Sequence, residues 1–210
     1  MLDTTSGRLR GAVIVSVVGL LGSLAFATSA SAQAETSVFF EEQAQANWAV
    51  QHECDGGTVI EARLLVESTR DFETPETEDA DPTVRVQYAG VCPEGSFNLV
   101  GNQIPATITS TENLKSVHAQ GEGIVRDALR NPHPVTFDVS WTGSGPLQTS
   151  VRTTSNQGFR INTSTEKRRE ATATGVVTID GEEIVNGAAN HRITPFIETL
   201  EERNTTPPSN

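Results

Sequence analysis

The sequence is poor in the residues from which metal and catalytic sites are usually built. It has two cysteines and four histidines in 210 residues. No two histidines have the spacing of an HxH or HExxH metal motif. Ser144 is not framed by the Gly-x-Ser-x-Gly pattern of a nucleophile elbow. We therefore predict no metal ion, no cofactor and no catalytic residue, and expect that the protein is not an enzyme.

Aromatic residues are also scarce, at 5% of the chain. A sugar-cleaving cleft normally uses aromatic side chains as stacking platforms beside its paired carboxylates. This scarcity argues mildly against a glycoside hydrolase. An extracellular hydrolase of any kind is the least favoured function, because no catalytic constellation is visible.

Positive charge is in short supply as well. The 15 Lys and Arg residues face 27 Asp and Glu residues, which gives a net charge of −12. Such a surface repels nucleic acids and anionic lipids. We predict no nucleic-acid partner, and the charge suits a protein that stays dissolved outside a cell.

Long apolar runs are absent except for one near the N-terminus, at residues 11–27. Arg8 and Arg10 precede this run, and Ala30-Ser31-Ala32 follows it with small residues, as in a secretory signal peptide. We predict that residues 1–32 are a cleaved signal peptide and that the mature protein is secreted, with no stable membrane insertion. Losing a net +1 would take the charge from −12 to −13. The alternative is a run retained as a membrane anchor.

The two cysteines, Cys54 and Cys92, are separated by 38 positions. In a secreted protein the default for two cysteines is a disulfide. Cys54 follows the first expected strand and Cys92 the third. In an up-and-down path these strands end at the same side of the sheet, so a bridge can join them.

The rest of the chain alternates apolar and polar residues with period two, as half-buried strands do. Only residues 126–132 and 195–204 have patterns that could form helical turns. We predict one all-β antiparallel domain over residues 33–200, with about nine or ten strands and a disordered tail at 201–210. A closed barrel is the first choice, because it removes exposed sheet edges, and a sandwich is the second. The expected strands are 43–51, 58–68, 83–91, 96–102, 106–110, 115–125, 135–143, 148–155, 158–165 and 171–180, with 190–200 as the last ordered piece.

Trp141 ends the apolar face of the segment "VTFDVSW" and has two interpretations. It packs in a core, or it lies at the mouth of a barrel and contacts a ligand. In the second case Trp48, Tyr88 and Phe137 join it as ligand-lining candidates, as in a lipocalin-like carrier of a small apolar molecule. Many other inward positions are small, including Ala44, Ala119 and Gly121, which fits either a filled core or a cavity.

Two segments together resemble a known group of proteins. "VSWTGSGPL" (139–147) is a strand that ends in Trp-Thr-Gly-x-Gly, and "REATATGVVTIDGEEI" (169–184) contains Ala-x-Ala-x-Gly. This combination resembles a group of small secreted bacterial all-β proteins of uncharacterised function. The resemblance implies secretion and an all-β body but no reaction. The first hypothesis for function is therefore a non-enzymatic binding or surface-associated module whose partner is unknown, with an extracellular protein or a small apolar ligand as the candidates. The alternative is the carrier of a small apolar ligand.

Overall fold

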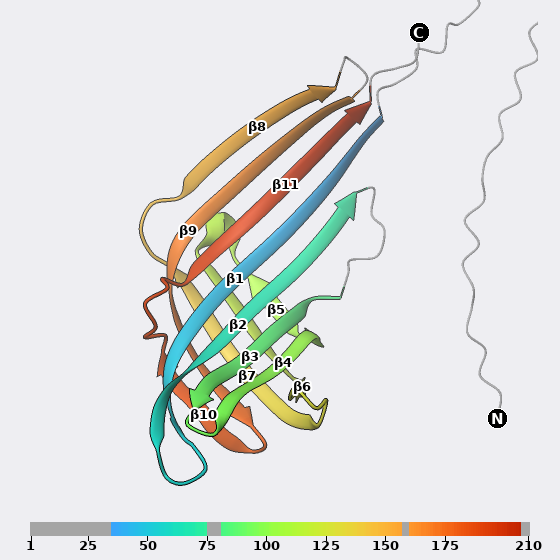
Figure 1. The fold of residues 1–210 in the computed structure, drawn as a ribbon. Helices are drawn as coiled ribbons and strands as arrows, with labels where there is room; N and C mark the ends of the chain where they lie inside the picture. Colours follow the sequence, from blue (N-terminus) through green and yellow to red (C-terminus); the bar gives the residue numbers. More distant parts are fainter. Residues whose placement is uncertain (1–34, 75–80, 157–159, 207–210) are drawn as a thin grey trace, which may run out of the picture. The chain divides into compact units, whose positions relative to one another are not determined.

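The computed structural model describes residues 35–74, 81–156 and 160–206, and within these ranges the chain is all β (Figure 1). The predicted signal peptide lies outside the described residues. No helix in the described ranges is long and apolar enough to cross a membrane. The elements are β1 (Glu35–Glu53), β2 (Val59–Thr74), β3 (Thr83–Cys92), β4 (Gly95–Pro105), β5 (Thr107–Ser110), the 3₁₀ turn η1 (Glu112–Leu114), β6 (Ser116–Arg126), β7 (Pro132–Gly143), β8 (Gln148–Asn156), β9 (Arg160–Ile179), β10 (Glu182–Ala188) and β11 (Phe196–Thr206).

The strands form one antiparallel sheet whose pairings close a ring. The ring runs β1–β2–β3–β4–β6–β7–β9–β11 and returns to β1. The least extensive strand pairing in the ring is that of β4 with β6, which consists of the single residue pair Val100↔Arg126. Further along the same side of β6, β5 takes the place of β4, with Thr107–Ser110 facing Val117–Gln120.

Strand β9 is the longest and changes neighbours halfway. Its first half, Arg160–Glu170, pairs with β8 and β11, and its second half pairs with β7 and β10. The sequence pattern predicted two strands here, at 158–165 and 171–180, separated by "EKRRE" (166–170). The predicted break at 166–170 is wrong, because the strand continues through these charged residues. Their side chains are exposed or partly exposed on both faces of the strand, so the period-two pattern is lost there.

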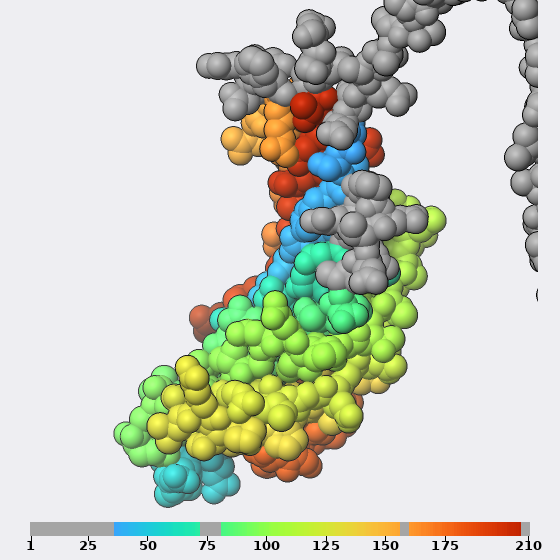
Figure 2. Space-filling model, turned by 90° about the vertical axis from the view of Figure 1, so that its right-hand side faces the viewer, coloured from blue at the N-terminus to red at the C-terminus, as the bar shows by residue number. Residues whose placement is uncertain are grey.

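We use the name extension for the part of the sheet that lies away from the packed interior. It consists of residues 35–43, 70–74, 148–156, 160–168 and 198–206, in the strand order β8–β9–β11–β1–β2. Figure 2 shows these blue, red and orange segments grouped together, apart from the green and yellow residues of β3 to β7. Within the extension, the only described side chains that are buried are those of Glu42 and Thr199.

The core lies inside the ring and follows the period-two pattern of the sequence. Inward residues such as Val84, Val86 and Tyr88 on β3 alternate with more exposed ones such as Arg85. The largest fully buried side chains are Trp48, Trp141, Leu64, Ile197, Val66, Val84, Val86, Val117, Val125, Val135, Val139 and Val177.

The small inward residues make room for large ones. A Cβ atom on Gly121 would lie 2.8 Å from Cζ of Phe137, and one on Gly175 would lie 2.8 Å from Cγ2 of Val139. The two motifs that carry the resemblance face each other in register, with Trp141 opposite Ala173. The small residues of β9 therefore accommodate bulky residues of β7. At these positions the core is filled by side chains.

The structure corrects three predictions about local structure. Residues 196–206 form β11, paired with β1 and β9, and not the helical turn and disordered tail expected at 195–204 and 201–210. Residues 126–132 contain a reverse turn closed by the Asp127 carboxylate, which accepts a hydrogen bond from the Asn131 backbone N–H at 2.8 Å. Strand β10 was not predicted, because its seven residues contain only two large apolar side chains, Ile184 and Val185.

Candidate functional site

The four predicted ligand-lining residues all lie inside the ring. Trp48, Tyr88, Phe137 and Trp141 are buried, and Trp141 is 0% exposed. Trp48 Nε1 donates to the Gly187 carbonyl oxygen at 3.2 Å, which links β1 to β10. Trp141 Nε1 is buried without a hydrogen-bond partner among the described residues. Their surroundings are those of a packed core, so a recognition site has to be sought elsewhere.

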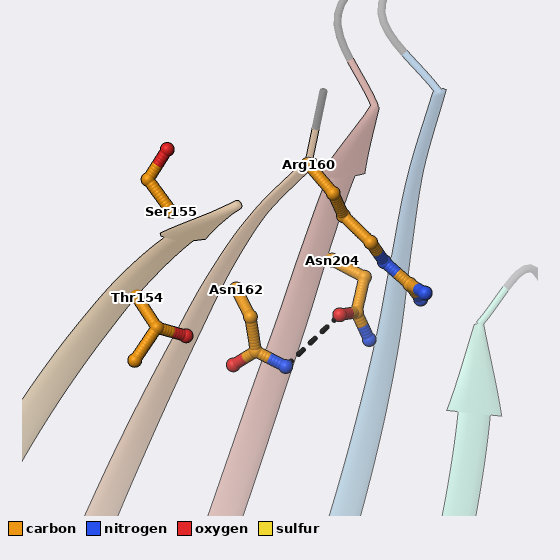
Figure 3. A pocket seen from close by; sticks show the side chains of 5 residues that line it. All are labelled: Thr154, Ser155, Arg160, Asn162 and Asn204. Atoms are coloured by element: carbon orange, nitrogen blue, oxygen red, sulfur yellow. Dashed lines mark hydrogen bonds between the residues drawn. The ribbon is translucent and has the colours of Figure 1, made fainter. Parts of the chain in front are cut away.

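One hollow lies on the extension, where β8, β9 and β11 run side by side (Figure 3). Thr154, Asn162 and Asn204 occupy neighbouring register positions on these strands. Asn162 Nδ2 donates to Asn204 Oδ1 at 3.0 Å, and the Arg160 side chain crosses β11 beside them. The hollow is polar and open, and the amide groups already satisfy one another in part. This arrangement offers surface hydrogen bonding but no buried recognition group.

A second cavity lies where the extension meets the ring, and we call it the junction cavity. Its volume is about 340 Å³. Three of its lining residues form one row across the sheet, with Glu42 on β1 opposite Thr199 on β11, and Thr199 opposite Lys167 on β9. The remaining lining residues are Phe40 and the segment Ser110–Leu114.

Glu42 is the unusual group of the junction cavity. Its side chain is only 8% exposed, and its Oε1 atom is buried with no hydrogen-bond partner among the described residues. Burial raises the pKa of this carboxyl above its ordinary value, while a hydrogen bond from Ser110 and the charge of Arg70 oppose the rise. A buried, incompletely paired carboxylate is costly to the fold. Such a cost is characteristic of functional positions.

The segment that covers the junction cavity has a strained backbone. Asn113 and Leu114 have φ angles of 59° and 54°, in the left-handed region. For a bulky residue such as Leu114, which is also buried, this conformation is a genuine outlier. Backbone strain of this kind is found preferentially at binding and active sites. The segment is held by Thr111, whose Oγ1 accepts a hydrogen bond from the Ser116 backbone N–H at 2.9 Å.

The far end of β1 and β3 carries the predicted disulfide. Cys54 and Cys92 are bonded, with a Cα–Cα distance of 5.8 Å, which confirms the prediction from the sequence. His52 lies beside them, and its Nδ1 atom is 2.9 Å from the Tyr88 hydroxyl.

The basic cluster in "EKRRE" takes part in local charge pairing. Arg168 Nη1 lies 3.3 Å from Glu198 Oε2. Its guanidinium also lies 4.0 Å from the ring centroid of Phe196. The cluster lies inside β9, where it forms a local salt bridge and not a hairpin tip.

Comparison with known proteins does not add a family. No protein-family model matches the chain, and searches of curated proteins and of solved structures find no similar protein. We therefore infer the function of the protein from the geometry of these sites.

The sequence contains a pattern that indicates the junction cavity, although we made no prediction from it. Ala44, Ala46 and Trp48 form the inward face of β1, and Glu42 is the next residue in the same phase. A carboxylate in line with a run of core positions indicates either the end of the core or a buried charge. The structure shows that both apply here.

Proposed function

We propose that this protein is a secreted, non-enzymatic binding module whose recognition site is the junction cavity. The observation that carries the proposal is the buried Glu42 carboxylate with an unpaired oxygen in a cavity roofed by strained backbone. A packed β domain has no structural need for such a group, whereas a ligand that donates a hydrogen bond would satisfy it.

The ring of strands is proposed to be a closed β-barrel. Antiparallel pairing around eight strands and one central core supports this architecture over a sandwich. Secretion is a further part of the proposal. It is supported by the signal-peptide pattern of residues 1–32, the acidic charge and the Cys54–Cys92 disulfide, which is typical of oxidising compartments. The resemblance to small secreted bacterial proteins agrees with it.

The alternative of a lipocalin-like carrier is less well supported. Its apolar ligand would have to displace side chains such as Trp48, Phe137 and Trp141, which are buried against one another in one cluster. Displacing well-packed core side chains costs several kcal/mol, on the order of 3–5 for an aromatic residue. An extracellular hydrolase has less support still, since the sequence shows no catalytic constellation and Glu112, the second carboxylate of the cavity lining, is exposed to water.

The chemistry of the lining defines the ligand class. Glu42 requires an ammonium or hydroxyl group that donates to Oε1, and Phe40 and Leu114 offer apolar surface for the rest of the molecule. The ligand is therefore a small organic molecule with a donor at one end and an aliphatic or aromatic portion at the other.

The test is an NMR titration with three probes that share one carbon chain, namely butylammonium, butanol and butyrate. We expect shift changes confined to residues around the junction cavity, with affinity in the order ammonium, alcohol, carboxylate. In Glu42→Gln the preference for ammonium over alcohol should disappear. A matched control, Glu198→Gln, changes a carboxylate on the opposite face of the extension and should leave the order intact. The absence of localised shifts with all three probes would refute this function.

A second candidate function, docking of an extracellular protein, is favoured by the open edge of β8. This nine-residue strand pairs only with β9 among the described residues. It has no proline and only one charged side chain, Arg152. Edge strands usually carry such protective residues, so β8 suits pairing with another strand. Sedimentation velocity tests the simplest partner, a second copy. We expect concentration-dependent dimers that Val151→Lys weakens, and a monomer at every concentration would exclude self-association.

A further inference from the structure

Another candidate site lies at the end of the ring opposite the extension, where three potential metal ligands lie close together. His52 and Cys54 come from the end of β1, and Cys92 is the last residue of β3. The imidazole nitrogen and the two Sγ atoms all lie within 4.8 Å of one another. Zn–S bonds of about 2.3 Å and Zn–N bonds of about 2.0–2.1 Å put tetrahedral ligand atoms roughly 3.5–3.8 Å apart. A movement of about 1 Å per side chain reaches that geometry.

His52 is held in place by two neighbouring side chains. Its Nδ1 atom is 2.9 Å from the Tyr88 hydroxyl oxygen, and its ring is 4.3 Å from that of Phe97 between centroids. If Nδ1–H donates to the Tyr88 oxygen, Nε2 presents a lone pair. Metal-binding histidines normally have such a partner on the second nitrogen.

Backbone hydrogen bonds also hold each cysteine within its own turn. Cys54 N–H donates to the Thr58 carbonyl at 2.8 Å, and Gly57 N–H donates to the Cys54 carbonyl at 3.0 Å. Cys92 is paired with Gly95 in the β3–β4 hairpin. Reduction of the S–S bond therefore leaves the two sulfur atoms next to each other.

The surroundings favour a cation and give it access. A cavity of about 450 Å³ opens beside the cluster, and Glu53, Asp55 and Glu94 are among its lining residues. Glu94 Oε1 accepts a hydrogen bond from the Asp55 backbone N–H at 3.0 Å, which joins the two hairpin loops. A water molecule or one of these carboxylates can complete four-coordination, as in sites with three protein ligands.

We propose that reduction of the Cys54–Cys92 disulfide creates a binding site for one thiophilic divalent cation such as Zn²⁺, held by Sγ of both cysteines and Nε2 of His52. A small dithiol transfers two electrons and two protons to the disulfide and becomes a cyclic disulfide itself. The two thiols then bind the ion and release two protons. A small-molecule disulfide then accepts two electrons from the two thiolates and two protons from water, and leaves as two thiols. The S–S bond of the chain forms again and the ion is released, so that the chain alternates between a crosslinked form and a metal-bound form.

The test uses Co²⁺ as a spectroscopic substitute for Zn²⁺. The full chain is reduced with a phosphine, which converts the disulfide to two thiols while water supplies the oxygen of the phosphine oxide. Circular dichroism checks that the strands persist. We expect one Co²⁺ per chain, with thiolate-to-cobalt charge-transfer and tetrahedral ligand-field bands that Zn²⁺ removes. The oxidised chain should bind no Co²⁺ at this site.

Two variants test the role of His52. His52→Ala should lower the affinity of the reduced chain by at least tenfold, and Tyr88→Phe, which removes only the hydroxyl, by about tenfold. His118→Ala, at an exposed histidine on β6, is the matched control and should bind like the wild type. The proposal is overturned if the reduced chain loses its strands, if it binds no stoichiometric Co²⁺, if the oxidised chain binds equally well, or if His52→Ala leaves the affinity unchanged.

Discussion

The ring and the extension share several strands but differ in what surrounds those strands. Strands β1, β2, β9 and β11 run through both regions. In the ring, alternate residues are buried apolar side chains, whereas in the extension the described side chains are polar or partly exposed on both faces. Strand formation therefore does not require a core on either face when neighbours on both sides supply the hydrogen bonds. The buried core of the ring contributes stability to the fold, whereas the extension contributes exposed surface.

The boundary between the two regions has properties that neither has alone. Glu42 occupies an inward position of β1, yet the apolar layer below it ends at Ala44 and Ile197. The carboxylate is buried enough to lose water but lies next to a cavity. We infer that recognition is located at this boundary because a buried carboxylate with an unpaired oxygen borders a cavity there.

The largest expected difference between the regions is in stability. Trp141→Ala, in the ring, should lower the free energy of unfolding by ~3–5 kcal/mol, because the cavity left by a fully buried aromatic side chain cannot close. Val151→Ala, in the extension, should change it by less than about 0.5 kcal/mol, since that side chain is 64% exposed. Urea denaturation measures both. Equal effects would mean that the extension contributes to the core.

The next effect concerns the disulfide. Replacing both cysteines by serine should cost about 3–4 kcal/mol, the chain-entropy value for a loop of this length. Hydrogen exchange should show the loss across the whole ring, because the bridge restrains the unfolded chain. Loss of protection confined to the β1 and β3 ends would point to local strain relief instead.

A smaller and pH-dependent effect is expected at Glu42. Its raised pKa means that the folded state binds the proton more tightly than the unfolded state. The stability due to this group is complete below the unfolded pKa and is lost as pH rises through the folded value. Glu42→Gln should therefore gain stability relative to the wild type as pH rises above about 4.5, with the full difference present at neutrality.

Unfolding curves of both proteins from acid to neutral pH provide this comparison. Glu41 and Glu198 also have raised pKa values but remain in both proteins, so their contributions cancel in the difference. A difference in stability that does not vary with pH would contradict the assignment.

Most strands of the ring could be predicted from the sequence, because the alternation of apolar and polar residues follows which side chains are buried. Trp141, Val139 and Phe137 were assigned to one face of a strand, and the structure buries that face. The extension was predicted poorly for the same reason. "EKRRE" has no buried residue, and residues 195–204 bury only Ile197 and Thr199, so their patterns resemble a loop and a helix.

The junction cavity was not predicted from the sequence. Pairing of β1 with β11 brings Glu42 opposite Thr199, a contact between residues more than 150 positions apart. Period-two reasoning assigns residues to faces within one strand but not to partners across the sheet. The Cys54–Cys92 pair could be predicted, because two cysteines in a meander leave only one pairing.

The most direct test of the account is the pKa of the Glu42 carboxyl itself, measured by carbon-detected NMR with and without butylammonium. The account predicts a pKa above the ordinary value of 4.5 in the free protein, which falls when the ammonium group binds to the carboxylate. An ordinary pKa that butylammonium does not change would show that Glu42 is hydrated and that the junction cavity is not the recognition site.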